Sequence, residues 1–545
     1  MSITLNGTTG ITTPAIDNQG NLTVDGGTIK LDGNYPVGTN NVALGDGALD
    51  ASLTGASNTA IGSYSLTNNT SGASNTGLGF AALGDTTTGN YNTGIGTSAL
   101  ENNTTASNNT AVGYQSLFDN TTGAQNVALG MFALANNTTA DYNTAVGYAA
   151  MEANTGGSNT AVGGSAMYSN TTGNSNTSVG TESLENNTTG SFNTAVGKEA
   201  LESNTTASYN TAVGYNALTS NTTGPALTAI GAYALANNTT GSSNTAAGWY
   251  ALISNTTGSD NTAVGRGVMQ SNTTGYSNVA IGGAGVFHAA ALQGNTEGYG
   301  NIAIGAALTG NTTGTQNVAI GRTAMYSSTT GSSNVAIGQA ALGGNTTGGN
   351  NTAVGYQAGD TITTGINNTI IGYDCDAAST SANAIALGHG VTSSSDYFYF
   401  GKAGNVVYNN FTANASWTRS SDERWKKDIN TNTDLGLDFI NAIRTVTYKW
   451  KAPSELDSTL SGYNADVTSA GYEDKMYGFI AQEVKQALDD SGITNFSGWN
   501  IDGTSPDDKQ GVSYEMFVVP LINAIQEQQA TITALTARIT ALENL

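Results

Sequence analysis

The stretch that decides the fold is Asn109-Thr-Ala-Val-Gly113-Tyr-Gln-Ser-Leu117-Phe-Asp-Asn120-Thr-Thr-Gly-Ala-Gln125. Variants of it fill most of the chain, each with Asn-Thr-Ala-Val/Ile-Gly, then a small residue and Leu, then Asn-Thr-Thr-Gly. We count positions in each unit from the glycine after the Val or Ile, which we call the bend glycine. A repeat of this length predicts a solenoid in which each coil stacks on the last.

The bend glycine occurs 21 times between Gly45 and Gly388. Sixteen of the 20 intervals are 17 residues, three are 16 and one is 23. At ~4.8 Å per coil the stack would be on the order of 100 Å long. The long interval inserts extra residues around 282–292, which are either a tolerated surface bulge or a receptor-contacting loop.

The apolar pattern predicts which side chains face the interior. We expect three inward positions in each unit. The first two are spaced as in a strand with one buried face, and the third is usually a Leu or Met. They are the third residue before the bend glycine (Thr59, Val127, Ile302), the residue directly before it (Ile61, Val112, Leu129) and the fourth after it (Leu66, Leu100, Met151, Met325). The bend glycine and the small residue before Leu would permit close backbone approach. The recurrent Asn four residues before the glycine would hydrogen-bond along the stack.

Two other interpretations of the repeat stay open. Asn-Thr-Thr is a glycosylation sequon, but a repeated turn explains it better because no secretory signal is visible at the N-terminus. The Thr columns would also fit an ice-binding face, although Thr is also common in half-buried strands.

Residues 1–40 contain two short alternating runs that predict small strands and a segment for attachment. Residues 389–420 contain aromatic strands, Tyr397–Phe400 and Val406–Tyr408, that would cap the solenoid and pack on sister chains, or stack on carbohydrate.

Composition excludes several functions. The chain of 545 residues has a net charge of −23, and only Lys30, Lys198, Arg266 and Arg322 precede residue 400, so nucleic-acid binding is not expected. No apolar run is long enough to predict membrane insertion. Cys375 is the only cysteine and should be a partly buried small apolar side chain. The only histidines are His288 and His389, so we predict no metal site and no cofactor.

Residues 421–545 have a different character, with mixed charge, a polar loop at 453–474 and several predicted helices and strands, including a short strand at 512–514. Helical spacing covers 435–443, a strand follows at 445–450, and 477–488 begins as a strand and becomes an amphipathic helix. The last run, about 516–545, is a heptad helix that predicts a coiled coil. Its a positions are Val518, Ile525, Ile532 and Ile539, and its d positions are Leu521, Gln528, Leu535 and Leu542. Ile at a with Leu at d favours a coiled coil of two helices.

The junction between the two parts reads Ser420-Ser421-Asp-Glu-Arg-Trp-Lys426-Lys-Asp-Ile429. A serine five residues before a lysine could form a Ser/Lys dyad, since a serine hydroxyl needs a base and a neutral lysine can be one. Lys427 and Arg424 would help to lower the pKa of Lys426. The alternative is that Ser421 caps a helix, with Asp422 in its first turn.

Two families resemble parts of the chain. The Asn-x-Ala-Ile/Val-Gly-x-x-Ala repeat over 41–388 resembles the left-handed parallel β-roll in the heads of trimeric autotransporter adhesins. The junction motif, followed by Tyr477-Gly-Phe-Ile-Ala-Gln-Glu-Val484, resembles the intramolecular chaperone of the S74 peptidase family, which ends bacteriophage tail spikes and fibres. That resemblance implies a homotrimer and self-cleavage between Ser420 and Ser421, with Ser421 as nucleophile and Lys426 as its partner.

The sequence therefore predicts a mostly β protein: an N-terminal segment (1–40), a solenoid (41–388), an aromatic cap (389–420) and a small α+β chaperone (421–545). The favoured function is a virion tail fibre, made in the host cytoplasm, that binds a host-surface receptor or glycan and contacts other tail proteins. Its only enzymatic act would be a single-turnover serine autoproteolysis. The alternatives are a glycan-degrading tail spike, which would need a carboxylate pair, and a bacterial trimeric adhesin.

Overall fold

The computed structural model describes residues 39–51, 54–285, 289–410, 418–419, 429–432, 434–460, 463–466, 475–501 and 510–544. The chain divides into two compact units, 1–420 and 421–545, which are described one at a time. The two small strands predicted within residues 1–40 lie outside the described residues.

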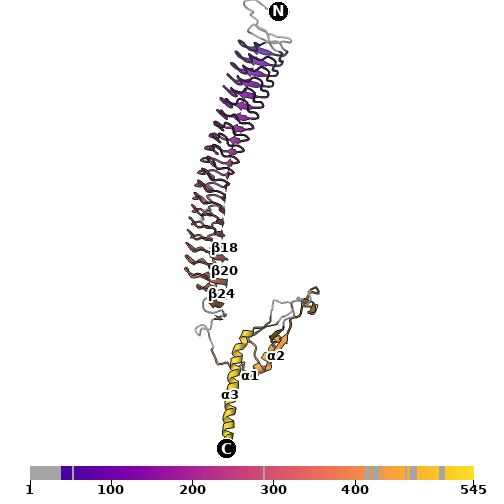
Figure 1. Cartoon of the computed structure of the whole chain (residues 1–545), viewed down its shortest axis with the longest axis vertical. Coiled ribbons are helices and arrows are strands. Elements are labelled where there is room, and N and C mark those ends of the chain that lie inside the picture. The colour runs from indigo at the N-terminus through magenta and orange to yellow at the C-terminus, as the bar shows by residue number, and fades with distance from the viewer. Residues whose placement is uncertain are drawn as a thin grey trace, which may run out of the picture. The chain divides into compact units, whose positions relative to one another are not determined.

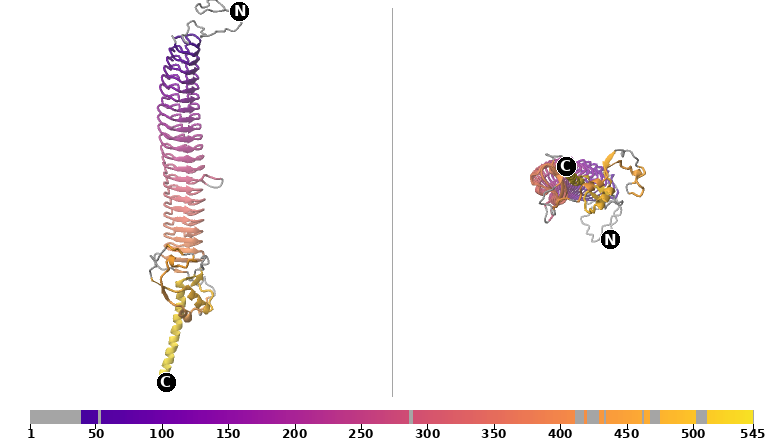
Figure 2. Two further views of the ribbon diagram at one scale, coloured as in Figure 1. Left: turned by 90° about the vertical axis from the view of Figure 1, so that its right-hand side faces the viewer. Right: turned by 90° about the horizontal axis from the view of Figure 1, so that it is seen from below.

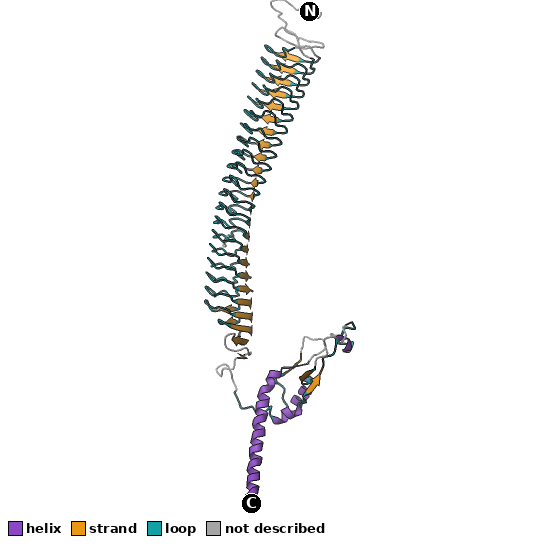
Figure 3. Cartoon of the chain, in the orientation of Figure 1, coloured by secondary structure: helices purple, strands orange, loops and turns teal. Residues whose placement is uncertain are grey.

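The first unit is a parallel β-solenoid with one short strand per coil, as predicted. Neighbouring strands pair in parallel and in register; Thr110 lies beside Val127, and Val112 beside Leu129. The strands line one side of the solenoid and loops form the rest (Figure 1, Figure 3), with the coils closely stacked (Figure 2). The strands are β1 (Val42–Leu44), β2 (Thr59–Ile61), β3 (Thr76–Leu78), β4 (Thr93–Ile95), β5 (Thr110–Val112), β6 (Val127–Leu129), β7 (Thr144–Val146), β8 (Thr160–Val162), β9 (Thr177–Val179), β10 (Thr194–Val196), β11 (Thr211–Val213), β12 (Thr228–Ile230), β13 (Thr245–Ala247), β14 (Thr262–Val264), β15 (Val279–Ile281), β16 (Ile302–Ile304), β17 (Val318–Ile320), β18 (Val335–Ile337), β19 (Thr352–Val354), β20 (Thr369–Tyr373) and β22 (Ile385–His389).

The predicted inward face of the strands is wrong. The central residue of each strand, which in most strands is an alanine such as Ala111 or Ala128, is buried, whereas Val127 and Leu129 on either side of Ala128 are 40% and 47% exposed. Because alternate strand residues face opposite ways, one buried position places both neighbours outside. The prediction fails in the same way at Thr59, Ile61, Val112 and Ile302, which are half-buried or exposed.

The narrow interior explains this orientation. Gly94 takes the place of the central alanine in β4, and a Cβ there would already lie 3.0 Å from the Ala99 carbonyl oxygen and 3.2 Å from Leu83 Cγ. A valine therefore does not fit beside this leucine; the buried Ile370 of β20 is accommodated where Gly359 takes the place of the leucine in the preceding coil. The predicted inward position four residues after the bend glycine is confirmed, since Leu66, Leu100, Met151 and Met325 are fully buried and meet the strand alanines in one continuous core. Cys375 also joins this core and is fully buried, more deeply than the partial burial predicted.

The bend glycines are required by both conformation and space. Gly113 has φ +138°, and a Cβ on it would lie 2.5 Å from the carbonyl oxygen of Gly130, the bend glycine of the next coil. L-residues with side chains rarely adopt this conformation. The bend therefore turns the chain away from the strand while adjacent coils touch backbone to backbone, as the sequence predicts.

Two buried asparagine columns run along the solenoid. In the predicted column, Asn109 Oδ1 accepts from the backbone N–H of Asn126 in the next coil at 2.8 Å, and Asn109 Nδ2 donates to the Gly123 carbonyl at 2.8 Å. The second column belongs to Asn-Thr-Thr. Asn120 Nδ2 donates to Asn103 Oδ1 and to the Gly123 carbonyl, both at 2.9 Å. Its side chain is fully buried, so in the folded solenoid the sequon serves as a structural turn.

Replacing Asn120 with Ala should weaken the coils around it. Asn137 Nδ2, which donates to Asn120 Oδ1, would lose that acceptor inside the solenoid. We expect a loss of about 2 kcal/mol of local stability, which corresponds to roughly 30-fold faster amide hydrogen exchange in these coils. Thr105→Ala changes an exposed side chain in a neighbouring coil and should leave exchange unchanged. Equal effects of the two variants would contradict a structural role for this column.

The 23-residue interval leaves both columns intact. Strand β15 pairs directly with β16, and Asn295 Nδ2 donates to Asn272 Oδ1 at 2.8 Å across the insertion. The extra residues therefore leave the stack between Gly282 and Ala291, and residues 286–288, His288 among them, lie outside the described residues. A role in receptor contact stays a prediction.

The solenoid ends in an aromatic hairpin. Strand β24 (Tyr397–Lys402) extends the parallel ladder on β22, so the pairing runs past residue 388, and β25 (Asn405–Asn410) then reverses direction. Tyr399 and Tyr408 stack across this hairpin, with ring centroids 4.9 Å apart. Two further pairings complete the end: the two-residue strands β21 (Asp376–Ala377) and β23 (Thr392–Ser393), and β26 (Thr418–Arg419) on β25.

The second unit is a small α+β domain followed by a long helix. Its described elements are α1 (Leu437–Ala442), β27 (Val446–Tyr448), the short helix η2 (Pro453–Glu455), β28 (Met476–Gly478), α2 (Ala481–Asp490), β29 (Trp499–Ile501), β30 (Gln510–Val512), the short helix η3 (Tyr514–Phe517) and α3 (Val518–Glu543). The predicted helices and strands occur in the predicted order, and β30 lies close to the strand predicted at 512–514; η2, β29 and η3 were not predicted. Strands β27 and β28 pair antiparallel, as do β29 and β30.

Candidate assembly and cleavage site

The predicted dyad sits where the two units meet in the sequence. Ser420 is the last residue of the first unit and Ser421 the first of the second. Ser420, Ser421 and Lys426 all lie outside the described residues, so the distance between the serine and the lysine stays a prediction. The site is therefore built from the described residues that follow the junction.

A cluster of aromatic rings holds the second unit together. Phe517, at the end of η3, lies 5.0 Å from the ring of Phe479, 5.3 Å from Phe496 and 6.2 Å from Phe439. Phe439 and Phe517 are almost fully buried. Phe517 directly precedes α3 in the sequence, so the burial of its ring in this core fixes the start of the long helix.

Residues 477–484, the second part of the sequence motif described above, pack against this core. Gly478 lets Tyr514 approach, because a Cβ there would lie 2.2 Å from the tyrosine oxygen. That hydroxyl accepts a hydrogen bond from the backbone N–H of Phe479 at 3.3 Å. Val484, from the first turns of α2, is fully buried in the core. These residues therefore bind α2 and η3 to one another.

One charged pair was not predicted from the sequence. Arg444 donates from Nε and Nη2 to the two carboxylate oxygens of Glu483, at 3.2 and 2.5 Å. This hydrogen-bonded guanidinium lowers the pKa of Glu483 below its usual value. The pair is exposed and fixes the loop after α1 against α2, which makes it a positioning contact; a separation of 39 residues gives no sequence signal for it.

Helix α3 carries the predicted heptad, and no described part of the single chain covers its apolar seam. Asn523 Nδ2 and Glu527 tie its first half to α1, through the Leu435 carbonyl at 3.2 Å and the Leu437 N–H at 2.7 Å. All eight predicted a and d side chains are exposed: Val518, Leu521, Ile525, Gln528, Ile532, Leu535, Ile539 and Leu542. An apolar seam of this kind is buried only when other helices pack on it.

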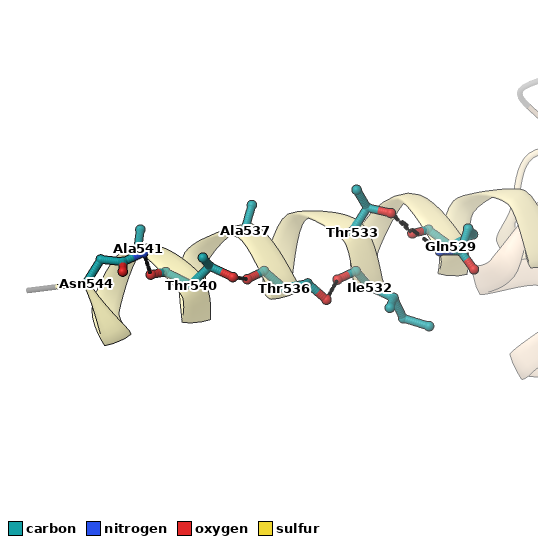
Figure 4. A pocket seen from close by; sticks show the side chains of 8 residues that line it. All are labelled: Gln529, Ile532, Thr533, Thr536, Ala537, Thr540, Ala541 and Asn544. Atoms are coloured by element: carbon teal, nitrogen blue, oxygen red, sulfur yellow. Dashed lines mark hydrogen bonds between the residues drawn. The ribbon is translucent and has the colours of Figure 1, made fainter.

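In the second half of α3, the surface beside this seam is formed mainly by small side chains. Figure 4 shows small side chains along it, with hydroxyls bonded back to the helix itself: Thr533 to the Gln529 carbonyl at 2.8 Å, Thr536 to Ile532 at 2.8 Å and Thr540 to Thr536 at 2.9 Å. Because these hydroxyls are satisfied internally, this face presents mainly methyl groups.

A second unpartnered surface runs along the solenoid. The outward strand residues form two parallel columns of Thr, Val, Ile and Leu, which we call the outer ladder; Ile302 and Ile304 on β16 are 37% and 38% exposed. Monomeric proteins rarely expose apolar surface continuously over such a length. The apolar pattern alone does not predict this surface, although the small residue at the centre of nearly every strand is a usable signal.

Within the described ranges, no group of three or more metal-ligating side chains comes together. None of the helices placed there combines the length and the hydropathy that a membrane crossing requires.

Comparison with known proteins gives one match. Residues 421–493 match the model of the peptidase S74 family, described as the chaperone of endosialidase. Comparisons with curated proteins and with solved structures find no match. The match starts at the first residue of the second unit. The chain thus joins a parallel β-solenoid of about 21 coils to an S74-type intramolecular chaperone domain that begins at Ser421.

Proposed function

We propose that this protein is a trimeric virion tail fibre that attaches a bacteriophage to the surface of its host. The S74 match directly after a long solenoid is the observation that carries this proposal. In the proposed fibre, sister chains cover the outer ladder, the seams of three α3 helices pack together, and other tail proteins and a host receptor bind elsewhere.

The physical need for a chaperone supports this division of labour. Parallel pairing along a solenoid of identical coils can slip by one coil at little cost, because each unit resembles the next. Long-range pairing is also slow to form. A C-terminal domain that gathers three chains at one end would set their register before the solenoids pack side by side.

Self-cleavage would then release the chaperone. In this scheme Ser421 Oγ attacks the carbonyl carbon of Ser420 while its proton passes to neutral Lys426 Nζ. The peptide C–N bond breaks, the Ser421 amine takes up the proton, and an ester joins the two serines. Water hydrolyses that ester into a Ser420 carboxylate and a free Ser421 hydroxyl. The products are residues 1–420 and 421–545. Loss of the template would leave a fibre that persists because unfolding is slow.

The Ser421→Ala variant tests this function. We expect one full-length band from the variant and two fragments from the wild type on a denaturing gel, with a new N-terminus at Ser421. Ser420→Ala is the matched control, since it keeps the scissile carbonyl and the nucleophile and should still be cut. An uncut wild type, or a cut Ser421→Ala chain, would refute the proposed chemistry.

A further inference from the structure

One part of the solenoid surface differs from the rest in its chemistry. Two aromatic columns follow the bend glycine, and over four successive coils they form a connected group that ends in a cation. We call this group the aromatic patch; its members are Tyr215, Tyr233, Trp249, Tyr250 and Arg266. The coils concerned have their bend glycines at Gly214, Gly231, Gly248 and Gly265.

The rings of the patch touch in sequence. Tyr215 meets Tyr233 edge to face, with ring centroids 5.3 Å apart, and Tyr233 stacks on Tyr250 at 5.1 Å. Trp249 and Tyr250 lie 4.2 Å apart at a tilt. Although packed against one another, Tyr215 and Trp249 are each 43% exposed. At ~4.8 Å per coil, the patch extends over roughly 15 Å of the solenoid.

The cation at the end of the patch is free to bind an anion. The Arg266 guanidinium lies over the ring of Trp249, 4.7 Å from its centroid. The N–H donors of a guanidinium lie in its own plane, so its attraction to the ring face uses none of them as hydrogen bonds. Among the described residues, the ion pairs do not include Arg266, whereas Lys198 is paired with Glu199 at 2.5 Å.

Other exposed aromatic groups on the solenoid lack this combination. Tyr114, Phe132 and Tyr148 also make a run of edge-to-face contacts over three coils, but no cation lies on their rings in the described structure. Arg322 occupies the same place in its coil as Arg266, directly after the bend glycine, and no described ring lies beneath it. These two sites provide matched controls.

We infer that the aromatic patch binds an acidic oligosaccharide of the host surface, with a sugar carboxylate held by Arg266. Faces of aromatic rings pack against the C–H faces of sugars, and a planar guanidinium forms paired hydrogen bonds with a carboxylate. The solenoid has almost no other positive charge, so the guanidinium of Arg266, which lies over Trp249, directs the acidic group to one end of the patch. This inference rests on the proposed attachment function and names its ligand class.

A glycan array that carries uronic-acid and neuraminic-acid oligosaccharides beside their neutral counterparts tests this site on the full chain. We expect the wild type to bind at least one acidic oligosaccharide and to bind its neutral counterpart at least about tenfold more weakly. Arg266→Gln and Trp249→Ala should each lose about tenfold or more in affinity, because a charge-assisted hydrogen bond or a stacking face is removed. Arg322→Gln and Tyr148→Ala should stay within about twofold of the wild type.

The assembly state of each variant is measured on the same samples. Suppose that all chains assemble and are cut, yet the wild type binds no acidic glycan, or Arg266→Gln binds as well as the wild type. Either result refutes the proposed glycan site and leaves the proposed fibre function intact. Failure of the wild type to trimerise would instead count against the proposed function.

Discussion

Placing aspartate at Ile525 and Ile532 of α3 is expected to leave the chain monomeric and uncut. These two a-position side chains are 63% and 49% exposed in the single chain, so the change disturbs no interior of the second unit. In a helix bundle the same carboxylates would be buried next to their symmetry mates, where desolvation and repulsion cost several kcal/mol per ion. The assembly equilibrium would therefore shift by many orders of magnitude, and native mass spectrometry with a denaturing gel measures both outcomes.

The matched control adds the same two charges to the adjacent positions, Gln526→Asp and Thr533→Asp. Both residues follow an a-position isoleucine and are exposed, and in a coiled coil they face solvent. This variant should assemble and be cut like the wild type. A trimeric, cut product from the Ile525/Ile532 variant would show that α3 does not gather the chains.

The second large effect is expected at a bend glycine. In Gly197→Ala the new methyl would lie 2.5 Å from the Gly214 carbonyl oxygen, and the residue would have to keep φ near +133°. Backbone strain alone costs about 1–3 kcal/mol, and the clash with fixed backbone adds to it. We expect the stack to open between these two coils and to become cleavable there by an added protease.

Gly164→Ala is the control for this change. Gly164 follows a bend glycine on the solenoid surface, and a Cβ on it would meet nothing within 4 Å. It should resist the protease as the wild type does. Equal resistance of Gly197→Ala would mean that adjacent coils are not held at backbone contact.

The repeat could be predicted from the sequence because period, turn residues and glycine spacing all agree. The inward face could not. A strand such as Thr-Ala-Val places its larger apolar residues on one face, and the hydrophobic rule assigns that face to the core. The closeness of Leu83 and the Ala99 carbonyl to the strand centre, which leaves space for only a small residue, is a tertiary property.

The corners of each coil were also beyond sequence reasoning. Leu117 has φ +52° and Gln115 has the same value, a left-handed conformation that costs L-residues roughly 1–2 kcal/mol. A leucine in the sequence gives no signal for this left-handed conformation. Its free-energy cost is offset only by the contacts between stacked coils. In the second unit, by contrast, helix and strand order followed directly from apolar spacing, and the α3 heptad from its a and d residues. The Ser421–Lys426 dyad is predicted from the sequence motif alone.

Native mass spectrometry of the purified wild-type product tests the central claim most directly, namely that a detachable C-terminal domain builds the trimeric solenoid. The account predicts a trimer of residues 1–420, free of residues 421–545, which appear as a separate species. Single chains of residues 1–420, or a stable assembly of uncut full-length chains, would contradict it.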